Sequence, residues 1–166
     1  MEKTHALSKL FKSLTGHNKL TVDNTVVSNF TLDRFLGTWY EVARFNHRFE
    51  RGIEKSKAHY ELRKDGKVNV LNSGIKRNKP SDAKGIAKLT DTPALLRVSF
   101  WGPFYSDYRI MMLDKDYKYA LIGGSTNDYL WILSRSPQIS EDVRNKILTE
   151  AQRRGYDTSK LIWVKQ

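Results

Sequence analysis

The side chains of this protein that could catalyse a reaction or bind a metal do not occur at the spacings of known catalytic or metal-binding motifs. None of the histidines occurs at a metal-ligand spacing such as H-E-x-x-H; they are His5, His17, His47 and His59. Gly123-Gly124-Ser125 lacks the Lys and the helix that follow a phosphate-binding loop. His47 and Glu50 could act as an acid–base pair on an ester, but nothing in the sequence orients them. We therefore expect that this protein is not an enzyme and that it has no metal site and no cofactor.

The composition narrows the class of protein further. The 166 residues include 29 Lys and Arg against 18 Asp and Glu, a net charge of +11, and 0 Cys. The absence of Cys excludes disulfides, thiol catalysis and Cys-ligated metals. No apolar run approaches the ~20 residues that cross a bilayer. The basic residues are spread along the chain and form no nucleic-acid motif, so we expect no nucleic-acid partner, and association with an anionic membrane surface stays open.

Residues 1–25 form a separate N-terminal amphipathic extension, and residues 26–166 form the main domain. In the extension, apolar residues recur at the helical spacing i, i+3, i+4 and i+7, at Leu7, Leu10, Phe11 and Leu14. No apolar core follows the charged start, so this segment is not a secretory signal. The helix either packs against the domain, which we favour because the apolar stripe is small, or lies at a membrane interface and is held there by basic charge.

From Ile53 onward, short alternating runs separated by turns predict an all-β barrel. After a first strand from Trp39, further strands are predicted at 53–63, 68–75, 83–89, 94–100, 107–113, 117–123 and 128–135. Arg77–Asp82 is expected to break the strand at 68–75 and to separate it from the next strand. Eight strands in up-and-down antiparallel order close into a barrel that holds its own side chains or one small ligand. A C-terminal α-helix capped by Ser140 and a short final strand follow.

The stretch from Asn29 to Gly52 organises this barrel. Asp33–Leu36 predicts a short helical turn that Gly37 ends. A glycine two residues before Trp39 lets the backbone turn sharply, so the indole ring can plug one end of the barrel. A glycine and a tryptophan at this spacing are weak evidence alone, because many β-domains contain a turn followed by a core Trp.

Two further motifs make the sequence similar to the lipocalin family. Gly37-Thr38-Trp39 matches the first motif of that family, Asp116-Tyr117 matches the second with Lys115 in place of its Thr, and Arg135 matches the third. The longer strings GTWYEVARFNHRFERG, WGPFY and DYLWILSR resemble the bacterial outer-membrane lipocalins. The resemblance runs from about residue 26 to the C-terminus.

This resemblance implies a lipocalin (calycin) barrel that binds a hydrophobic ligand in the cell envelope, in the periplasm or at the outer membrane. The chain departs from the bacterial group in two respects. It lacks the N-terminal Cys that carries a lipid in many of these proteins, and it shows no signal peptide. A cytoplasmic location therefore stays open.

Up-and-down connectivity predicts that the three motifs meet at one end of the barrel, which we call the closed end. The resemblance implies that a guanidinium lies over the Trp39 ring, a cation–π contact of about 0.5–2 kcal/mol. We therefore expect a structural role, not a binding role, for the motif residues Gly37, Trp39, Asp116, Tyr117 and Arg135.

The opposite end, which we call the mouth, collects the loops at 47–52, 74–82, 101–107 and 123–127. Arg48 and Arg51, beside Phe49, suit an amphiphile whose anionic head stays hydrated while its chain enters the barrel. Glu41 shares the inward parity of Trp39. It either faces the floor of the pocket or, as we favour, pairs with a nearby Arg or Lys.

Strand alternation predicts which side chains face the interior: Ala43, Phe45, Ala58, Tyr60, Leu62, Val68, Val70, Ala83, Gly85, Ala87, Leu96, Val98, Phe100, Tyr108, Ile110, Met112, Tyr129, Trp131 and Leu133. The small wall of Ala83, Gly85 and Ala87 and the flexible Met112 favour a cavity over a filled core. The predicted ligand-binding residues are Tyr60, Val70, Phe100, Tyr105, Tyr108, Met112, Tyr129 and Trp131, and the resemblance implies the roles of Tyr105 and Trp131.

We expect this protein to bind and store or transport a hydrophobic ligand, a fatty acid or a lysophospholipid, inside the barrel. It would do so as a monomer or a weak homodimer. The alternative is a basic module with a filled barrel that associates with anionic membranes or polyanions through its surface.

Overall fold

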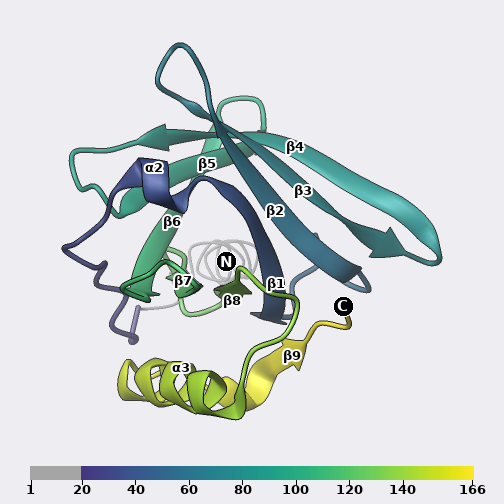
Figure 1. The fold of residues 1–166 in the computed structure, drawn as a ribbon, viewed down its shortest axis with the longest axis vertical. Coiled ribbons are helices and arrows are strands. Elements are labelled where there is room, and N and C mark those ends of the chain that lie inside the picture. The colour runs from purple at the N-terminus through teal and green to yellow at the C-terminus, as the bar shows by residue number, and fades with distance from the viewer. Residues whose placement is uncertain (1–19) are drawn as a thin grey trace, which may run out of the picture.

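Residues 20–166 fold into an antiparallel β-barrel with a helix along its outer wall, in a computed structural model that describes this part of the chain (Figure 1). The amphipathic helix predicted around residues 7–14 lies outside the described residues. The strands are β1 (Gly37–Phe45), β2 (Glu54–Leu62), β3 (Val68–Lys76), β4 (Lys79–Leu89), β5 (Leu95–Trp101), β6 (Phe104–Leu113), β7 (Tyr119–Gly123), β8 (Leu130–Ser134) and β9 (Leu161–Trp163). The helices are α2 (Leu32–Phe35), α3 (Glu141–Arg153) and the 3-10 turn η1 (Thr158–Lys160).

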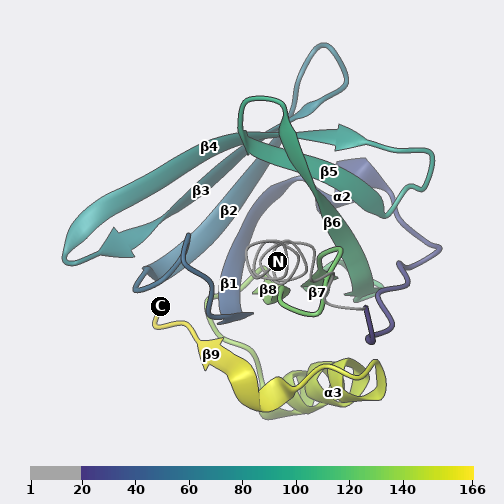
Figure 2. The same cartoon turned by 180° about the vertical axis from the view of Figure 1, so that it is seen from behind.

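The sheet closes on itself. Strands β2 to β8 pair in chain order, and β1 pairs antiparallel with both β8 and β2. The predicted eight-stranded up-and-down barrel, with a C-terminal helix and a short final strand, is therefore confirmed. Seen from behind in Figure 2, α3 and β9 lie together on one side of the barrel.

The C-terminal tail completes the barrel wall at the mouth. Strand β1 pairs with β2 over Gly37–Tyr40 and with β9 over Ala43–Phe45. Beyond β9, the Gln166 side-chain amide donates to the carbonyl oxygens of Glu41 (2.7 Å) and Ser56 (3.1 Å). Because these carbonyls belong to β1 and β2, the amide bridges the two strands where they separate.

The hairpin between β3 and β4 is tighter than the sequence predicts. The expected interruption at Arg77–Asp82 is wrong, because β4 starts at Lys79 and pairs with β3 along its length. Arg77 and Asn78 have φ angles of 51° and 61° and form the two-residue turn. Both central residues of a type I′ hairpin turn need positive φ, and Asn tolerates it well. Pro80 fits near the start of β4 because β5 pairs with only the second half of that strand.

A β-bulge in β1 changes which of its side chains face inward. The register with β8 shifts between Glu41 and Ala43, and Arg44 then lies opposite Trp131. Arg44 therefore faces the interior. The predicted inward orientation of Ala43 and Phe45 is wrong, since both pack outside the barrel with the residues under α3. A bulge inserts one residue, so alternation cannot be extended across it.

Helix α3 covers the outer wall of the barrel. The Ser140 hydroxyl accepts a hydrogen bond from the Val143 N–H at 3.2 Å, as expected of its N-cap. Ile147 and Ala151 are fully buried in a cluster with outward-facing residues of β1, β7 and β8. Gly155, with a φ of 94°, follows the helix end. Among residues 20–166, no helix is long and apolar enough to cross a membrane.

Arg135 joins the elements of the closed end. Its guanidinium carbon lies 3.9 Å from the centroid of the Trp39 ring, so the expected cation–π contact is confirmed. The same guanidinium donates to four backbone carbonyls, those of Thr38 (3.0 Å), Arg34 (2.9 Å), Phe35 (3.2 Å) and Tyr117 (3.2 Å). The three motifs therefore meet at the closed end, as up-and-down connectivity predicts.

The other motif residues shape the backbone around this contact. Gly37 has a φ of 94°, and a Cβ there would lie 3.4 Å from Arg135 Nη1. The Tyr117 hydroxyl accepts a hydrogen bond from the Thr31 N–H at 2.9 Å. Asp116 is exposed and takes part through its backbone N–H, which donates to an Asp114 carboxylate oxygen at 3.2 Å.

We expect Arg135→Ala to lower the free energy of unfolding by about 2–3 kcal/mol, because it removes the cation–π contact and the charge-assisted bonds to carbonyls. Urea unfolding measures the change. Arg153→Ala is the matched control, since its ion pair with Glu150 is exposed and should contribute little to stability. Equal losses for the two variants would contradict the structural role of Arg135.

Candidate functional site

Aromatic side chains fill the half of the barrel next to the closed end. Phe35 is fully buried, with ring centroids 4.9 Å from Trp39 and 5.5 Å from Tyr60. The hydroxyls of Tyr60 and Tyr108 lie 2.9 Å apart, and burial raises the pKa of both, so the pair stays neutral. Val70 is buried in the same cluster. Tyr60 and Tyr108 therefore form the floor of any pocket above them.

Inward-facing aromatic rings near the mouth are less covered. Tyr129 and Trp131 are half-buried and stack with centroids 5.8 Å apart. Phe100 is 41% exposed, and its ring lies against the inner face of β4, where a Cβ on Gly85 would be 2.8 Å from it. The glycine thus leaves room for the ring. Apolar surface that faces inward and stays exposed is the surface a hydrophobic ligand would cover.

A buried pair of hydrogen-bonded side chains, Glu41 and Arg44, lies beside these rings. Glu41 and Arg44 are 6% and 2% exposed, and Arg44 Nη1 donates to Glu41 Oε1 at 2.8 Å. The favoured prediction, that Glu41 pairs with a basic residue, is confirmed. Arg44 Nη2 also donates to the carbonyl oxygens of Glu50 (2.7 Å) and Ile53 (3.0 Å) in the loop between β1 and β2. Arg44 therefore holds this mouth loop against the barrel wall.

Glu50 extends the polar cluster to the aromatic rings. Its Oε2 atom lies 2.8 Å from His47 Nε2 and accepts a hydrogen bond from Trp131 Nε1 at 3.1 Å. The His47 ring also contacts Tyr129, with centroids 5.6 Å apart. Two nitrogen atoms of the cluster, Arg44 Nε and His47 Nδ1, are buried without a hydrogen-bond partner among the described residues. A polar atom that reached either nitrogen would complete its bonding.

The pKa values of the two carboxylic acids of the cluster are shifted in opposite directions. Burial raises the pKa of Glu41 to about 8, and the nearby Glu50 carboxylate adds to this effect against the opposing Arg44. Burial alone would also raise the pKa of Glu50, but hydrogen bonds from His47 and Trp131 outweigh it and lower that pKa. Near neutral pH the cluster therefore holds its negative charge on Glu50.

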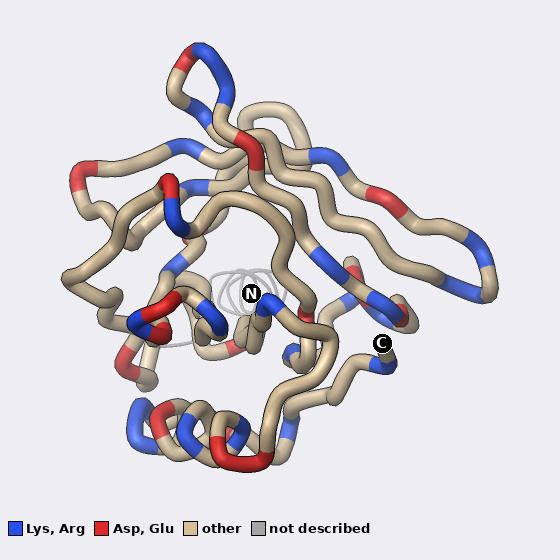
Figure 3. Tube along the Cα trace, viewed as in Figure 1, with Lys and Arg blue, Asp and Glu red and all other residues tan. Residues whose placement is uncertain are grey.

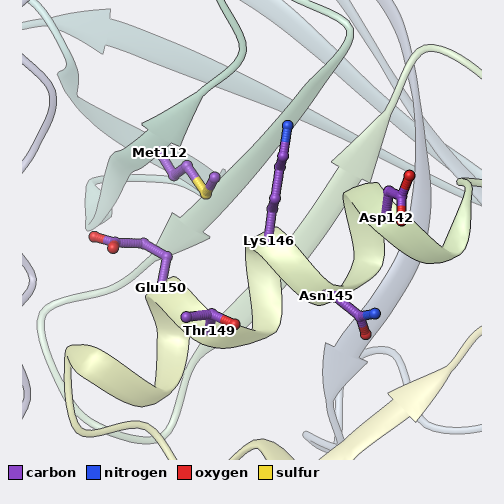
Figure 4. Close-up of a pocket in the computed structure, with 6 residues that line it drawn as sticks. All are labelled: Met112, Asp142, Asn145, Lys146, Thr149 and Glu150. Atoms are coloured by element: carbon purple, nitrogen blue, oxygen red, sulfur yellow. The ribbon is translucent and has the colours of Figure 1, made fainter.

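Two predicted binding residues lie outside the barrel. Met112 packs against the α3 cluster and lines a groove of about 560 Å³ with residues of that helix (Figure 4). Its predicted inward orientation is wrong because the register of β6 and β7 shifts between Ile110 and Met112. The Tyr105 ring lies under the Lys88 ammonium at 3.8 Å, on the face of the sheet opposite to Tyr108, and borders a hollow of about 350 Å³ whose lining also includes Phe100. Tyr105 therefore does not join the interior rings.

The mouth residues lie in the loop that Arg44 holds. Arg48 and Arg51 are exposed, and Phe49 is 69% exposed with the Arg48 guanidinium 5.0 Å from its ring centroid. These side chains lie at the entrance of the barrel and do not line its interior. The predicted interior residues Leu62 and Ala83 are exposed. Leu62 is the last residue of β2, and Ala83 lies in the part of β4 that pairs with β3 but not with β5.

Sequence reasoning missed Arg44 and Ser56. Ser56 is buried, and its hydroxyl donates to Glu41 Oε2 at 3.4 Å. Its parity with Tyr60 in β2 was a usable signal, because alternate residues of a strand share a face. Arg44 gave no such signal, since the bulge before it reverses the parity.

The comparisons with known proteins agree with this geometry. A family model described as a lipocalin-like domain matches residues 30–166. The chain belongs to the lipocalin family. It is similar to the outer membrane lipoprotein Blc of Escherichia coli strain K12, with 53% identity over 146 residues that cover 86% of this chain and 82% of that protein. It is also similar to the protein of the same name from Vibrio cholerae, at 43% identity over 84% of this chain and 85% of that protein.

Solved structures support the same lipocalin fold. Insecticyanin from the tobacco hornworm Manduca sexta superposes with a TM-score of 0.70 at 19% identity, covering 86% of this chain and 84% of that one. At this identity the likeness concerns the fold alone. Membership of the family supports a general capacity to bind a hydrophobic ligand.

We expect the stability of the protein to fall as the pH rises from about 4.5 to about 8, because folded Glu41 keeps a proton that the unfolded chain releases. The slope from this residue is at most about 1.4 kcal/mol per pH unit. Glu41→Gln removes the effect, so its stability relative to the wild type should be greater at pH 8.5 than at pH 5.5 in urea unfolding. Glu61→Gln, at an exposed site of β2, is the control. A relative stability of Glu41→Gln that does not change with pH would refute the raised pKa.

Proposed function

We propose that this lipocalin binds a single-chain lipid, a fatty acid or a lysophospholipid, in the mouth half of its barrel, and stores or transports it. The observation that carries the proposal is the exposure of inward-facing aromatic rings, of which Phe100 is 41% exposed, above a packed floor. Tyr129 and Trp131, which stack on each other, would form another wall of the binding site. The packed half beneath them limits how far an acyl chain can enter.

The chain of the lipid would provide most of the affinity. Each CH₂ group that leaves water contributes roughly 0.8 kcal/mol before the costs of association are subtracted. The stacked rings of Tyr129 and Trp131 offer flat apolar surface, and the Trp131 N–H is already bound to Glu50. A hydrocarbon chain can therefore pack on Trp131 without leaving a buried donor unpaired.

The head of the lipid would lie at the mouth. Arg48 and Arg51 are exposed beside Phe49, and guanidinium groups bind carboxylates and phosphates well. An oxygen atom that passed deeper could reach Arg44 Nε or His47 Nδ1, which have no partner among residues 20–166. This arrangement favours an anionic or phosphate-bearing head over a neutral one.

A location in the cell envelope follows from the relatives, since the similar bacterial proteins are named outer membrane lipoproteins. We propose the same compartment for this protein, and we propose that it acts as a monomer or weak homodimer without catalysis.

His47 and Glu50, the residues that could form an acid–base pair, are instead joined to Trp131 and Arg44 in the buried cluster. Their positions favour a role in holding the mouth loop.

We expect Trp131→Ala to weaken binding of a monomeric lysophospholipid by at least about tenfold, because a buried aromatic ring contributes on the order of 1.5–3 kcal/mol. Isothermal titration calorimetry on delipidated protein measures the affinity. Tyr105→Ala is the matched control, as its ring lies on the outer surface under Lys88, and it should change the affinity by less than about twofold. Equal affinities for Trp131→Ala and the wild type would exclude the interior site.

A further inference from the structure

Three large aromatic side chains are exposed at the mouth of the barrel. Phe49 is 69% exposed in the loop between β1 and β2, and Trp101 and Phe104 are 81% and 74% exposed on the β5–β6 hairpin. Trp101 and Phe104 are cross-strand partners on either side of the hairpin turn. Exposed aromatic residues gathered at one end of a molecule mark an interaction site more often than a chance feature.

Basic side chains are exposed on two of the loops at this end of the barrel. The loops 46–55 and 76–79 expose Arg48, Arg51, Lys55, Lys76, Arg77 and Lys79, against one exposed carboxylate, Glu54. In Figure 3 the tip of the β3–β4 hairpin is basic. The described end of the chain lies here too, since the Thr21 N–H donates to Asn127 Oδ1 at 3.1 Å in the loop between β7 and β8.

The closed end differs from the mouth. Its loops 63–67 and 114–118 also contain basic residues, but acidic residues alternate with them at Asp65, Asp114 and Asp116. The Tyr117 ring in these loops is buried under the Arg34 guanidinium at 4.2 Å. Exposed aromatic rings and unbalanced basic charge thus coincide at the mouth.

We infer that the mouth is a docking surface for an anionic lipid bilayer. Trp and Phe side chains favour the interface between lipid headgroups and acyl chains, and each Lys or Arg near an anionic leaflet strengthens attachment. Docking in this orientation directs the barrel entrance at the bilayer, so a lipid would pass between membrane and barrel with little exposure to water. The inference does not rest on the proposed ligand, because Trp101, Phe104 and the basic β3–β4 turn are not among the residues proposed to bind it.

Flotation of the full chain with vesicles tests this inference. We expect binding to vesicles of phosphatidylcholine and phosphatidylglycerol (3:1) and at least about tenfold weaker binding to phosphatidylcholine alone or in high salt. The double variants Arg77→Glu/Lys79→Glu and Trp101→Ser/Phe104→Ser should each lower binding about tenfold or more. The matched control Lys64→Glu/Lys67→Glu makes the same charge change at the closed end and should stay within about twofold of the wild type.

Three outcomes would overturn the inference. The first is wild-type binding by both mouth variants, and the second is an equal loss in the closed-end control, which would indicate net charge alone. The third is binding to heparin as tight as to vesicles, with no effect of Trp101→Ser/Phe104→Ser, which would indicate a polyanion site. Trp131→Ala should float like the wild type, so failure of the docking surface and failure of the interior site are separate results.

Discussion

A guanidinium buried in the wall of an apolar barrel must be paired, and the pairing of Arg44 shapes the functional half of this molecule. The bulge in β1 turns Arg44 inward, where it donates hydrogen bonds to the Glu41 carboxyl group and to two carbonyls of the first mouth loop. Removing one partner of such a pair leaves a buried charge uncompensated, which costs about 3–5 kcal/mol. The loop position, the orientation of Glu50 and the hydrogen bond to Trp131 all depend on this contact.

The two ends of the barrel have different roles. At the closed end, Arg135 and Trp39 join three separated segments, and the aromatic core above them is fully packed. At the mouth, the inward Phe100 ring and the side chains of Phe49, Trp101 and Phe104 stay exposed. Stability is thus concentrated at one end, and the other end keeps apolar surface available for lipid. The same division explains why the family motifs, which lie at the closed end, give little information about the ligand.

The fold was predictable from the sequence because its signals are local and periodic. Short alternating strands, the Ser140 cap and the three motifs led to the correct barrel, helix and closed end. The contact between Arg135 and Trp39 could be expected because up-and-down connectivity and family resemblance agree on it. The tight turn at Arg77-Asn78 was missed because Pro80 and its polar neighbours suggest a loop, although positive φ at Asn is typical of hairpin turns.

The interior was less predictable because bulges break the alternation on which it depends. Arg44 and Met112 each lie on the face of the sheet opposite to the one that regular alternation predicts, and each lies beside a register shift. Tyr105 is a different case: it lies three residues from the inward Tyr108, so alternation already places it on the outer face. The resemblance to bacterial lipocalins nevertheless placed Tyr105 among the predicted binding residues. Register shifts depend on long-range pairing, and a single sequence does not reveal them.

The central claim is that one lipid chain lies beside Trp131 inside the barrel, and contact quenching tests it most directly. A fatty acid brominated at mid-chain, titrated into delipidated protein, should quench tryptophan emission saturably at about one ligand per chain. In a Trp101→Phe background, which removes the exposed tryptophan of the β5–β6 hairpin, the quenching should be largely lost on adding Trp131→Phe, because Trp39 is buried in the packed floor and Trp163 belongs to β9 outside the barrel. Quenching that is unchanged in Trp131→Phe, or no saturable quenching at all, would contradict the account.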